Sequence, residues 1–259
     1  MIVDLHNHTV LCNHAEGEID EYIHKAIENG TKIFGFSDHA PMDFDPKYRM
    51  GFEQMNSYET DVLNAKKKYE KEIEILLGYE VDYLKGHMDK RALHVEVDYL
   101  IGSVHFLDGW GFDNPEFIGA WETQDIDAIW QKYFDTIEDM ANSKLFDIVG
   151  HFDLIKVFKF MPKGDITKMA YKALEAIKKS DMVLELNVAG YRKKVAQPYP
   201  SLSLLKQAFK LNIPITFGSD AHKPEQVSMF NDEIIEMAKS VGYTKCAFFR
   251  KRKREFIEF

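Results

Sequence analysis

The sequence has few cysteines, no block of basic residues and no long apolar run. Only two cysteines occur, Cys12 and Cys246, so a disulfide framework is not expected and a reducing compartment is favoured. No apolar run approaches the roughly 18 residues of a membrane span. The first residues also lack a signal-peptide pattern. We therefore predict a cytoplasmic protein without membrane association.

Acidic residues outnumber basic ones, with 42 Asp and Glu against 33 Lys and Arg, so the formal net charge is −9. A surface that binds nucleic acid needs clustered Lys and Arg, so no nucleic-acid partner is expected. The one basic run, Arg250 to Arg254, is interpreted as the solvent-exposed end of a terminal strand. The sequence leaves the oligomeric state open.

The length of 259 residues suits a single barrel domain that spans residues 1–259. Seven short runs rich in Ile, Val, Phe and Leu predict buried parallel strands. They are Ile2–Leu5, Lys32–Phe36, Ile73–Gly78, Tyr99–Gly102, Phe146–Val149, Met182–Leu186 and Ile213–Phe217. Helices are predicted at Glu53–Lys71, Thr123–Ala141, Asp165–Lys179, Leu202–Lys210 and Val227–Lys239.

This alternation predicts an α/β fold with a closed or nearly closed parallel barrel. Asp165 is expected to cap its helix, and Gly30 and Gly242 stand where helix C-terminal caps belong. The segment Val81–Ala120 is long and irregular. It should contain one strand of its own and supply a wall of the active site.

Ligand-type side chains follow almost every predicted strand. Seven of the ten histidines stand at these places, together with two carboxylates: His6, His8, His14, His39, Glu80, His105, His151, Asp220 and His222. Each piece alone is a weak signal. Together they predict a metal site, because the C-terminal ends of barrel strands meet at one rim.

The composition of this set suggests which metals it binds. His6 and His8 lie two residues apart in a strand and can chelate one ion from the same side. Nine ligands exceed the need of one ion, so two or three are expected, with Glu80 as the bridging carboxylate. Imidazole with carboxylate suits Zn, Mn or Fe. Closely spaced ions of this kind favour hydrolysis of a phosphate ester.

In their order along the chain, these residues resemble the polymerase-and-histidinol-phosphatase (PHP) superfamily, from Met1 to about Pro224. The resemblance implies a distorted seven-stranded (β/α)7 TIM-like barrel with three divalent ions at its C-terminal rim. One ion would be held by His6, His8, Glu80 and Asp220, which form the catalytic group. A second would take Glu80, His105 and His151, and a third His14, His39 and His222. A bridging hydroxide would attack phosphorus in line.

Within the superfamily, the chain is most similar to the stand-alone histidinol-phosphatases. The similar stretches are Gly35–Pro41, Leu77–Tyr83, Gly102–His105, Gly150–Lys156, Glu185–Lys193 and Tyr199–Ser201. The resemblance implies hydrolysis of L-histidinol phosphate to L-histidinol and phosphate, a step of histidine biosynthesis. One departure is Gln197-Pro198, where the family usually has an acid before Tyr-Pro-Ser.

Several residues outside the ligand set are candidates for substrate contacts. A phosphate dianion favours a fixed guanidinium, and Arg192 is the candidate. Lys156 is a second candidate cation, and Ser103 a hydroxyl that lines the barrel. Asp43 or Asp45 is predicted to bind the substrate ammonium. The remaining histidines fit no site and should lie at the surface: His24, His87 and His94.

Three other functions remain open. A PHP-type enzyme could act on another phosphomonoester or a nucleotide, and a non-catalytic metal-binding module would carry the same ligands. An amidohydrolase is disfavoured, because those sites generally recruit a bridging lysine and Glu80 takes that place.

Overall fold

The computed structural model describes residues 1–259 and contains a seven-stranded parallel sheet. In spatial order its strands are β1 (Val3–Asp4), β2 (Ile33–His39), β3 (Glu74–Asp82), β4 (Tyr99–Ser103), β7 (Ile148–Val149), β8 (Val183–Asn187) and β9 (Ile215–Gly218). The two edges meet, because Leu5 N donates to Phe217 O at 2.9 Å and His8 N to Ala221 O at 2.9 Å. The predicted barrel of seven strands is therefore confirmed.

Each predicted apolar run overlaps one of these strands, and β2 and β3 continue furthest beyond the prediction. β2 extends to His39 and β3 to Asp82, with His39 paired to Glu80 in the parallel register. His39 and Glu80 therefore lie within strands, where the backbone ladder fixes their direction, and not in the loops that follow.

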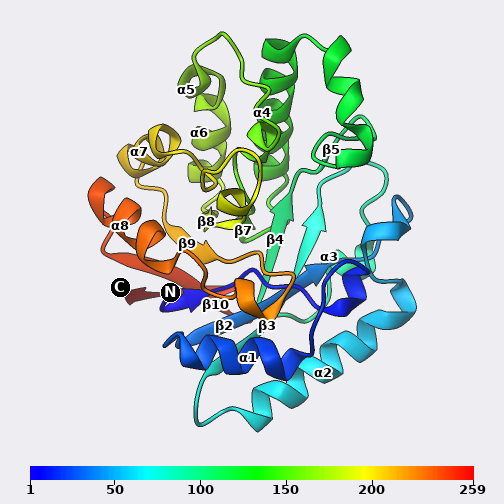
Figure 1. Cartoon of the computed structure of the whole chain (residues 1–259), viewed down its shortest axis with the longest axis vertical. Coiled ribbons are helices and arrows are strands. Elements are labelled where there is room, and N and C mark those ends of the chain that lie inside the picture. Colours follow the sequence, from blue (N-terminus) through cyan, green and yellow to red (C-terminus); the bar gives the residue numbers. More distant parts are fainter.

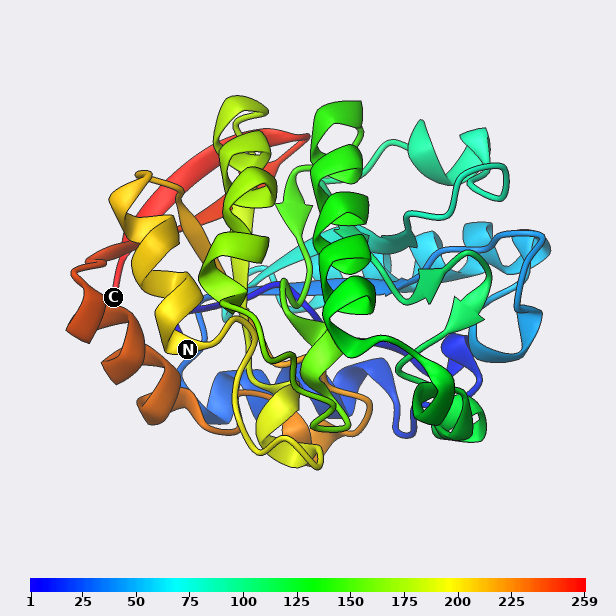
Figure 2. The ribbon, with the colours of Figure 1, turned by 90° about the horizontal axis from the view of Figure 1, so that it is seen from above.

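Helices pack around the outside of the sheet, as Figure 1 shows. Figure 2 shows α4, α6, α7 and α8 in succession along one side. The helix bounds are α1 (Ile19–Glu28), α2 (Met55–Lys68), α3 (Lys90–Leu93), α4 (Ile126–Ser143), α5 (Ile166–Met169), α6 (Tyr171–Lys179), α7 (Leu202–Lys210) and α8 (Asn231–Val241). No helix is both long enough and apolar enough to span a membrane.

Two helices differ from their prediction. The helix expected at Asp165–Lys179 is divided at Ala170 into α5 and α6, although Asp165 does cap it by accepting from Thr167 N at 2.9 Å. Helix α1 was not predicted. Its signal was present, because the buried residues Tyr22, Ile23 and Ala26 follow the three-and-four spacing of an apolar face.

The interior of the barrel is filled by Tyr99, which reaches from β4 to the opposite strands. Its hydroxyl donates to Leu5 O at 2.6 Å and approaches Phe36 O at 3.3 Å. A Cβ at Gly35 would lie 2.1 Å from this hydroxyl, and one at Gly78 would lie 2.6 Å from the ring. Both positions require glycine because the aromatic ring occupies the space a side chain would need.

The N-terminal end of the barrel is covered by a hairpin of β10 (Lys245–Arg250) and β11 (Lys253–Glu258). Its basic residues bind acids that precede or begin the barrel strands. Arg250 pairs with Glu74, Arg252 with Asp147 and Arg254 with Asp181. The run Arg250 to Arg254 was predicted to be the solvent-exposed end of a terminal strand, but it spans the turn of a terminal hairpin and its arginines pair with the barrel.

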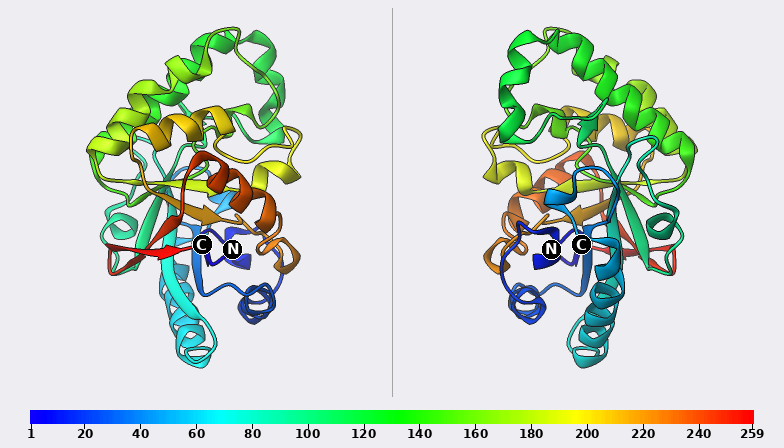
Figure 3. Two further views of the ribbon diagram at one scale, coloured as in Figure 1. Left: turned by 90° about the vertical axis from the view of Figure 1, so that its left-hand side faces the viewer. Right: turned by 90° about the vertical axis from the view of Figure 1, so that its right-hand side faces the viewer.

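The two chain termini lie near each other beside this hairpin (Figure 3). Phe259 N donates to Thr244 O at 3.2 Å, and Met1 is buried in the same apolar cluster as Cys246 and Phe248. The first strand and the final hairpin thus stabilise the same end of the barrel.

Candidate metal centre

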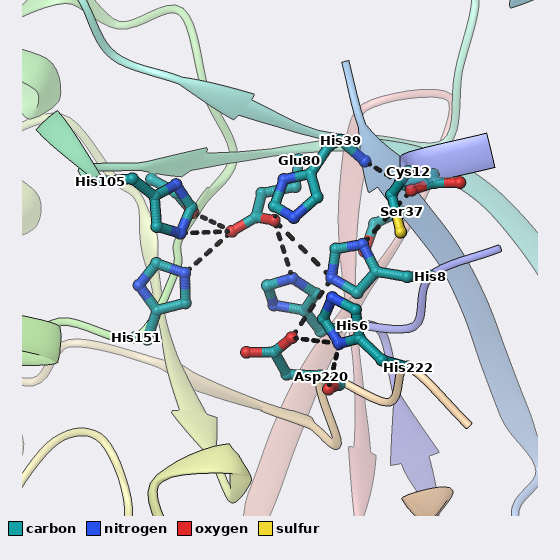
Figure 4. Close-up of polar contacts among 12 residues, drawn as sticks. His6, His8, Cys12, Ser37, His39, Glu80, His105, His151, Asp220 and His222 are labelled. Atoms are coloured by element: carbon teal, nitrogen blue, oxygen red, sulfur yellow. Dashed lines mark hydrogen bonds and ion pairs between the residues drawn. The ribbon is translucent and has the colours of Figure 1, made fainter. Parts of the chain in front are cut away.

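The nine predicted ligands come together at the C-terminal end of the barrel (Figure 4). Three groups have ligand atoms within 4.8 Å of one another: His6–His8–Glu80, Glu80–His105–His151 and His14–His39–His222. Asp220 joins the first group, since its Oδ1 lies 3.2 Å from His8 Nε2. These groups have the composition that the sequence predicted for three separate positions.

Glu80 lies at the centre of the cluster. Its Oε2 is 3.3 Å from His6 Nε2 and 2.9 Å from His39 Nδ1. Its Oε1 is 2.8 Å from His151 Nε2 and 3.7 Å from His105 Nε2. Because the two oxygens face different histidines, one carboxylate connects all three groups, which is the geometry of a bridging ligand.

A second layer of carboxylates holds the rings in place. His6 Nδ1 lies 2.7 Å from Glu185 Oε1, and His105 Nδ1 lies 2.6 Å from Asp82 Oδ1. Asp38 Oδ1 is 3.4 Å from His8 Nδ1. Metal-binding histidines commonly donate their other N–H to such a partner, which fixes the tautomer and the ring orientation. The sequence analysis did not assign these acids a role.

Five buried imidazole nitrogens make no well-aligned hydrogen bond. Three of them face a carboxylate oxygen: His6 Nε2 and His39 Nδ1 lie 3.3 Å and 2.9 Å from Glu80 Oε2, and His8 Nε2 lies 3.2 Å from Asp220 Oδ1. The other two, His151 Nδ1 and His222 Nε2, have no partner. A buried polar atom without a partner is costly, so such a concentration needs a compensating group. Divalent transition ions fit, because unprotonated imidazole and carboxylate are the donors that they prefer.

Electrostatics at the cluster keep its carboxylates ionised. Burial alone would raise the pKa of Glu80, but the facing histidines His6, His39 and His105 hold it well below its usual value. Burial and the nearby His39 and His8 lower the pKa of His14 to about 4. The cluster therefore offers an ionised carboxylate and, at His14, an unprotonated imidazole, which suits cations.

A cavity of about 440 Å³ opens above the cluster. The loop Asp113-Asn114-Pro115 and Phe106 line one side, so the predicted wall within Val81–Ala120 is present. Further lining residues were not predicted and come from distant segments: Tyr48, Arg49, Lys193, Tyr199 and Gln226. Cys12, also not predicted, lies with His8 and His222 in a fourth group of possible ligands.

Arg192 lines this cavity as expected. Its Nη2 donates to Ser219 O at 2.9 Å and to Asp220 O at 2.8 Å. Its Nη1 is buried and has no partner. The side chain is therefore fixed by one nitrogen while the other stays available at the cavity.

The other predicted substrate contacts lie elsewhere. Lys156 is 1% exposed and donates to Asp153 Oδ2 at 2.9 Å and Pro198 O at 2.7 Å, below the cavity lining. Its ammonium group is thus engaged in hydrogen bonds within the protein, and the predicted contact with phosphate is not supported. Ser103 is fully buried, and its hydroxyl donates to Glu80 Oε1 at 2.6 Å, so it orients the carboxylate.

Of the two aspartates predicted to bind an ammonium group, only Asp45 lines the cavity. Asp43 is exposed and pairs with His87. His24 hydrogen-bonds with the Tyr69 hydroxyl at 3.0 Å. His24, His87 and His94 all lie outside the cluster, as predicted.

Comparison with known proteins places the chain in a family. The family model of the PHP domain matches residues 4–189. The chain belongs to the PHP domain family. A probable histidinol-phosphatase of Deinococcus radiodurans is 35% identical over 98% of this chain and 98% of its own length. The histidinol-phosphatase of Bacillus subtilis is 28% identical over 90% of this PHP chain and 98% of its own.

Two solved structures have the same architecture. The putative histidinol phosphatase of Listeria monocytogenes has a TM-score of 0.78 at 26% identity, covering 89% of this chain and 99% of its own. The histidinol phosphate phosphatase of Lactococcus lactis, solved with zinc, L-histidinol and phosphate, has a TM-score of 0.81 at 18% identity and covers 98% of each chain. The second likeness establishes the fold.

Proposed function

We propose that residues 1–259 form one domain that hydrolyses L-histidinol phosphate to L-histidinol and phosphate, as a cytoplasmic step of histidine biosynthesis. The observation that carries this proposal is that Arg192 Nη1 makes no hydrogen bond and lines the same cavity as a cluster of buried imidazole nitrogens that also make none. The chain is 35% identical to a probable histidinol-phosphatase over nearly its whole length, which supports the choice of substrate.

Three divalent ions, Zn, Mn or Fe, fit the donor set. His6, His8, Glu80 and Asp220 would hold one, Glu80, His105 and His151 the second, and His14, His39 and His222 the third. Ions bound there supply an activated water and positive charge for the phosphoryl oxygens. Glu185, Asp38 and Asp82 keep the histidine rings oriented toward them.

Arg192 binds and orients the phosphate end of the substrate. Its Nη2 is held by two backbone carbonyls, so Nη1 is directed without a further cost in side-chain entropy. A guanidinium of this kind is well suited to a phosphoryl oxygen. Burial lowers the pKa of Arg192 from its usual value, although Asp220 opposes this effect, and the group still carries its charge near neutral pH.

The ammonium and imidazole of the substrate would lie toward the outer wall. Asp45 and Asp113 both line the cavity there. The Asp113 carboxylate makes no hydrogen bond or ion pair with another side chain and remains available to the substrate ammonium. Asp45, in contrast, lies 3.8 Å from Arg49 Nη2.

The test is a comparison of initial rates on histidinol phosphate, other phosphomonoesters, a nucleotide bisphosphate and an oligonucleotide, using metal-quantified protein. Histidinol phosphate should have the highest kcat/KM. Arg192→Ala should lower that value by about 10²-fold or more, with bound metal unchanged. Arg254→Ala, at the opposite end of the barrel, is the control. A preference for a nucleotide, or bound metal without any phosphatase activity, would overturn the proposal.

A further inference from the structure

Tyr199 presents a second buried polar atom without a partner at the same cavity. The residue is 1% exposed and lines the cavity, and its hydroxyl makes no hydrogen bond within the protein. Most buried tyrosine hydroxyls find a partner, since an unpaired one is costly. Tyr99, Tyr58 and Tyr243 in the same protein illustrate this rule, because each hydroxyl donates to a backbone carbonyl.

The position of Tyr199 brings it beside both the metal centre and Arg192. Its ring centroid lies 6.4 Å from that of His151, in an edge-on arrangement. A Cβ at Gly190, two residues before Arg192, would lie 2.9 Å from its Cζ. The phenol and the guanidinium therefore stand on the same side of the cavity, and both have one donor without a partner.

The segment that carries Tyr199 is held rigidly. Tyr199 and Asn187 exchange two backbone hydrogen bonds, at 2.9 Å and 2.7 Å. Lys156 Nζ donates to Pro198 O at 2.7 Å, and its partner Asp153 accepts from Ser201 N at 2.9 Å. Lys156 and Asp153 are each 1% exposed, so this ion pair is a buried clamp on both sides of Tyr199.

We propose that the Tyr199 hydroxyl donates a hydrogen bond to a phosphoryl oxygen of the substrate, next to Arg192 Nη1, and that Lys156 is its positioning residue. Burial raises the pKa of the phenol further above neutral pH, so the group remains a protonated donor and takes no part in proton transfer. The proposal rests on the proposed function only in requiring a phosphomonoester as the ligand.

The decisive variant is Tyr199→Phe, which removes the hydroxyl and keeps the ring. The inhibition constant for inorganic phosphate should rise about tenfold, and kcat/KM should fall by a similar factor. Thermal stability and bound metal should not decrease, because no protein hydrogen bond is lost. The matched control is Tyr243→Phe, whose hydroxyl donates to Ile213 O at 2.9 Å far from the cavity. It should lower Tm and leave the kinetics unchanged.

Lys156→Gln tests the positioning role. It should weaken phosphate binding to a similar degree, and the effect should not add to that of Tyr199→Phe, because both act through one hydroxyl. If this variant does not fold, Tyr199→Phe alone decides. An unchanged phosphate inhibition constant in Tyr199→Phe, or a drop in its Tm as large as that of Tyr243→Phe, would overturn the proposal.

This test is separate from the choice of substrate. If histidinol phosphate is not hydrolysed, the proposed function fails, but inorganic phosphate can still be titrated into metal-loaded protein by calorimetry. Weaker binding to Tyr199→Phe than to wild type would then uphold the role of Tyr199. Equal binding to both would reject it.

Discussion

The two ends of the barrel both concentrate charged side chains, but they satisfy them differently. At the N-terminal end, Arg250, Arg252 and Arg254 each pair with a carboxylate of the barrel. At the C-terminal end, seven histidines crowd around two carboxylates, Glu80 and Asp220, and His151 Nδ1, His222 Nε2, Arg192 Nη1 and the Tyr199 hydroxyl are buried without partners. Charges that the protein satisfies by itself stabilise the fold, whereas polar groups that it leaves unsatisfied indicate where ligands bind.

The largest effect should follow from changing Glu80, because this carboxylate connects all three ligand groups. Glu80→Gln keeps the shape and removes the negative charge. We expect kcat/KM to fall by about 10³-fold or more, with loss of at least one ion per chain. Metal analysis and initial rates on the same preparation would measure this. Full metal content with wild-type turnover would contradict a central role for Glu80.

A smaller effect on activity should follow from changing Glu185, one of the carboxylates that hold the metal-binding histidines in place. Glu185 accepts from His151 N at 2.7 Å and lies 2.7 Å from His6 Nδ1. Glu185→Gln places an amide where one of these acceptors stood, so metal affinity should fall by about 10- to 100-fold. Competition with a coloured chelator measures the change. Saturating metal should largely restore the activity, in contrast to Glu80→Gln.

Without metal, the histidines at the C-terminal end of the barrel should make the stability of the protein depend on pH. Burial alone would lower the pKa of His8 and of His105. Hydrogen bonds from His8 to Asp220 and Asp38 raise its pKa to about 9, and the charges of Asp82 and Glu80 raise that of His105 to about 10. The stability from these raised values is fully present below about pH 6.5 and is lost as the pH rises through 9 to 10.

Metal-free protein should therefore lose several degrees of Tm between pH 6.5 and 10. Metal-loaded protein should lose less, because bound ions replace the protons on these rings. Differential scanning calorimetry on both forms at the two pH values provides the comparison. Identical pH profiles would show that these histidines do not contribute as described.

The smallest effect on catalysis should come from substitutions at the N-terminal end of the barrel, where the arginines of the hairpin pair with carboxylates. Arg252 pairs with Asp147, which is 12% exposed, and donates to Leu145 O at 2.8 Å. Arg252→Ala should lower the free energy of unfolding by about 1–2 kcal/mol and leave kcat/KM unchanged. Arg254→Ala, whose partner Asp181 is 78% exposed, should be closer to wild type in stability. A kinetic defect in either variant would remove the distinction between the ends.

The ligand set could be predicted because the residue types and their spacing in the sequence identify metal ligands. His6-x-His8 and Asp220-x-His222 combine an unusual composition with a two-residue spacing. The strand expected to direct these pairs is wrong, because β1 ends at Asp4 and β9 at Gly218, and both pairs lie in the segments that follow, joined by the bridge between Asn7 and Ala221. Short apolar runs marked the strands that precede them, and the alternation of strand and helix indicated the barrel.

Other parts of the site depend on contacts that no local pattern reveals. Lys156 follows a ligand and carries a charge suited to phosphate, yet the turn after β7 directs it at Asp153 and Pro198. Tyr199 belongs to the Tyr-Pro-Ser stretch that resembles the family, but no local pattern shows its contacts, which depend on where Asn187 and Lys156 hold its segment. The lengths of β2 and β3 were missed because tertiary pairing extends them beyond their local signals, whereas the periodic signal of helix α1 was present in the sequence and was overlooked.

The hydrogen bonds that join β1 to β9 have a consequence for biosynthesis of the molecule. His6 and His8 emerge early from the ribosome, but the residues that complete their pocket, Asp220 and His222, are translated more than two hundred codons later. A nascent chain thus carries seven of its nine ligands before the last two are made. The complete site cannot form before residue 222 is translated, and premature termination before residue 220 yields a product unable to assemble it.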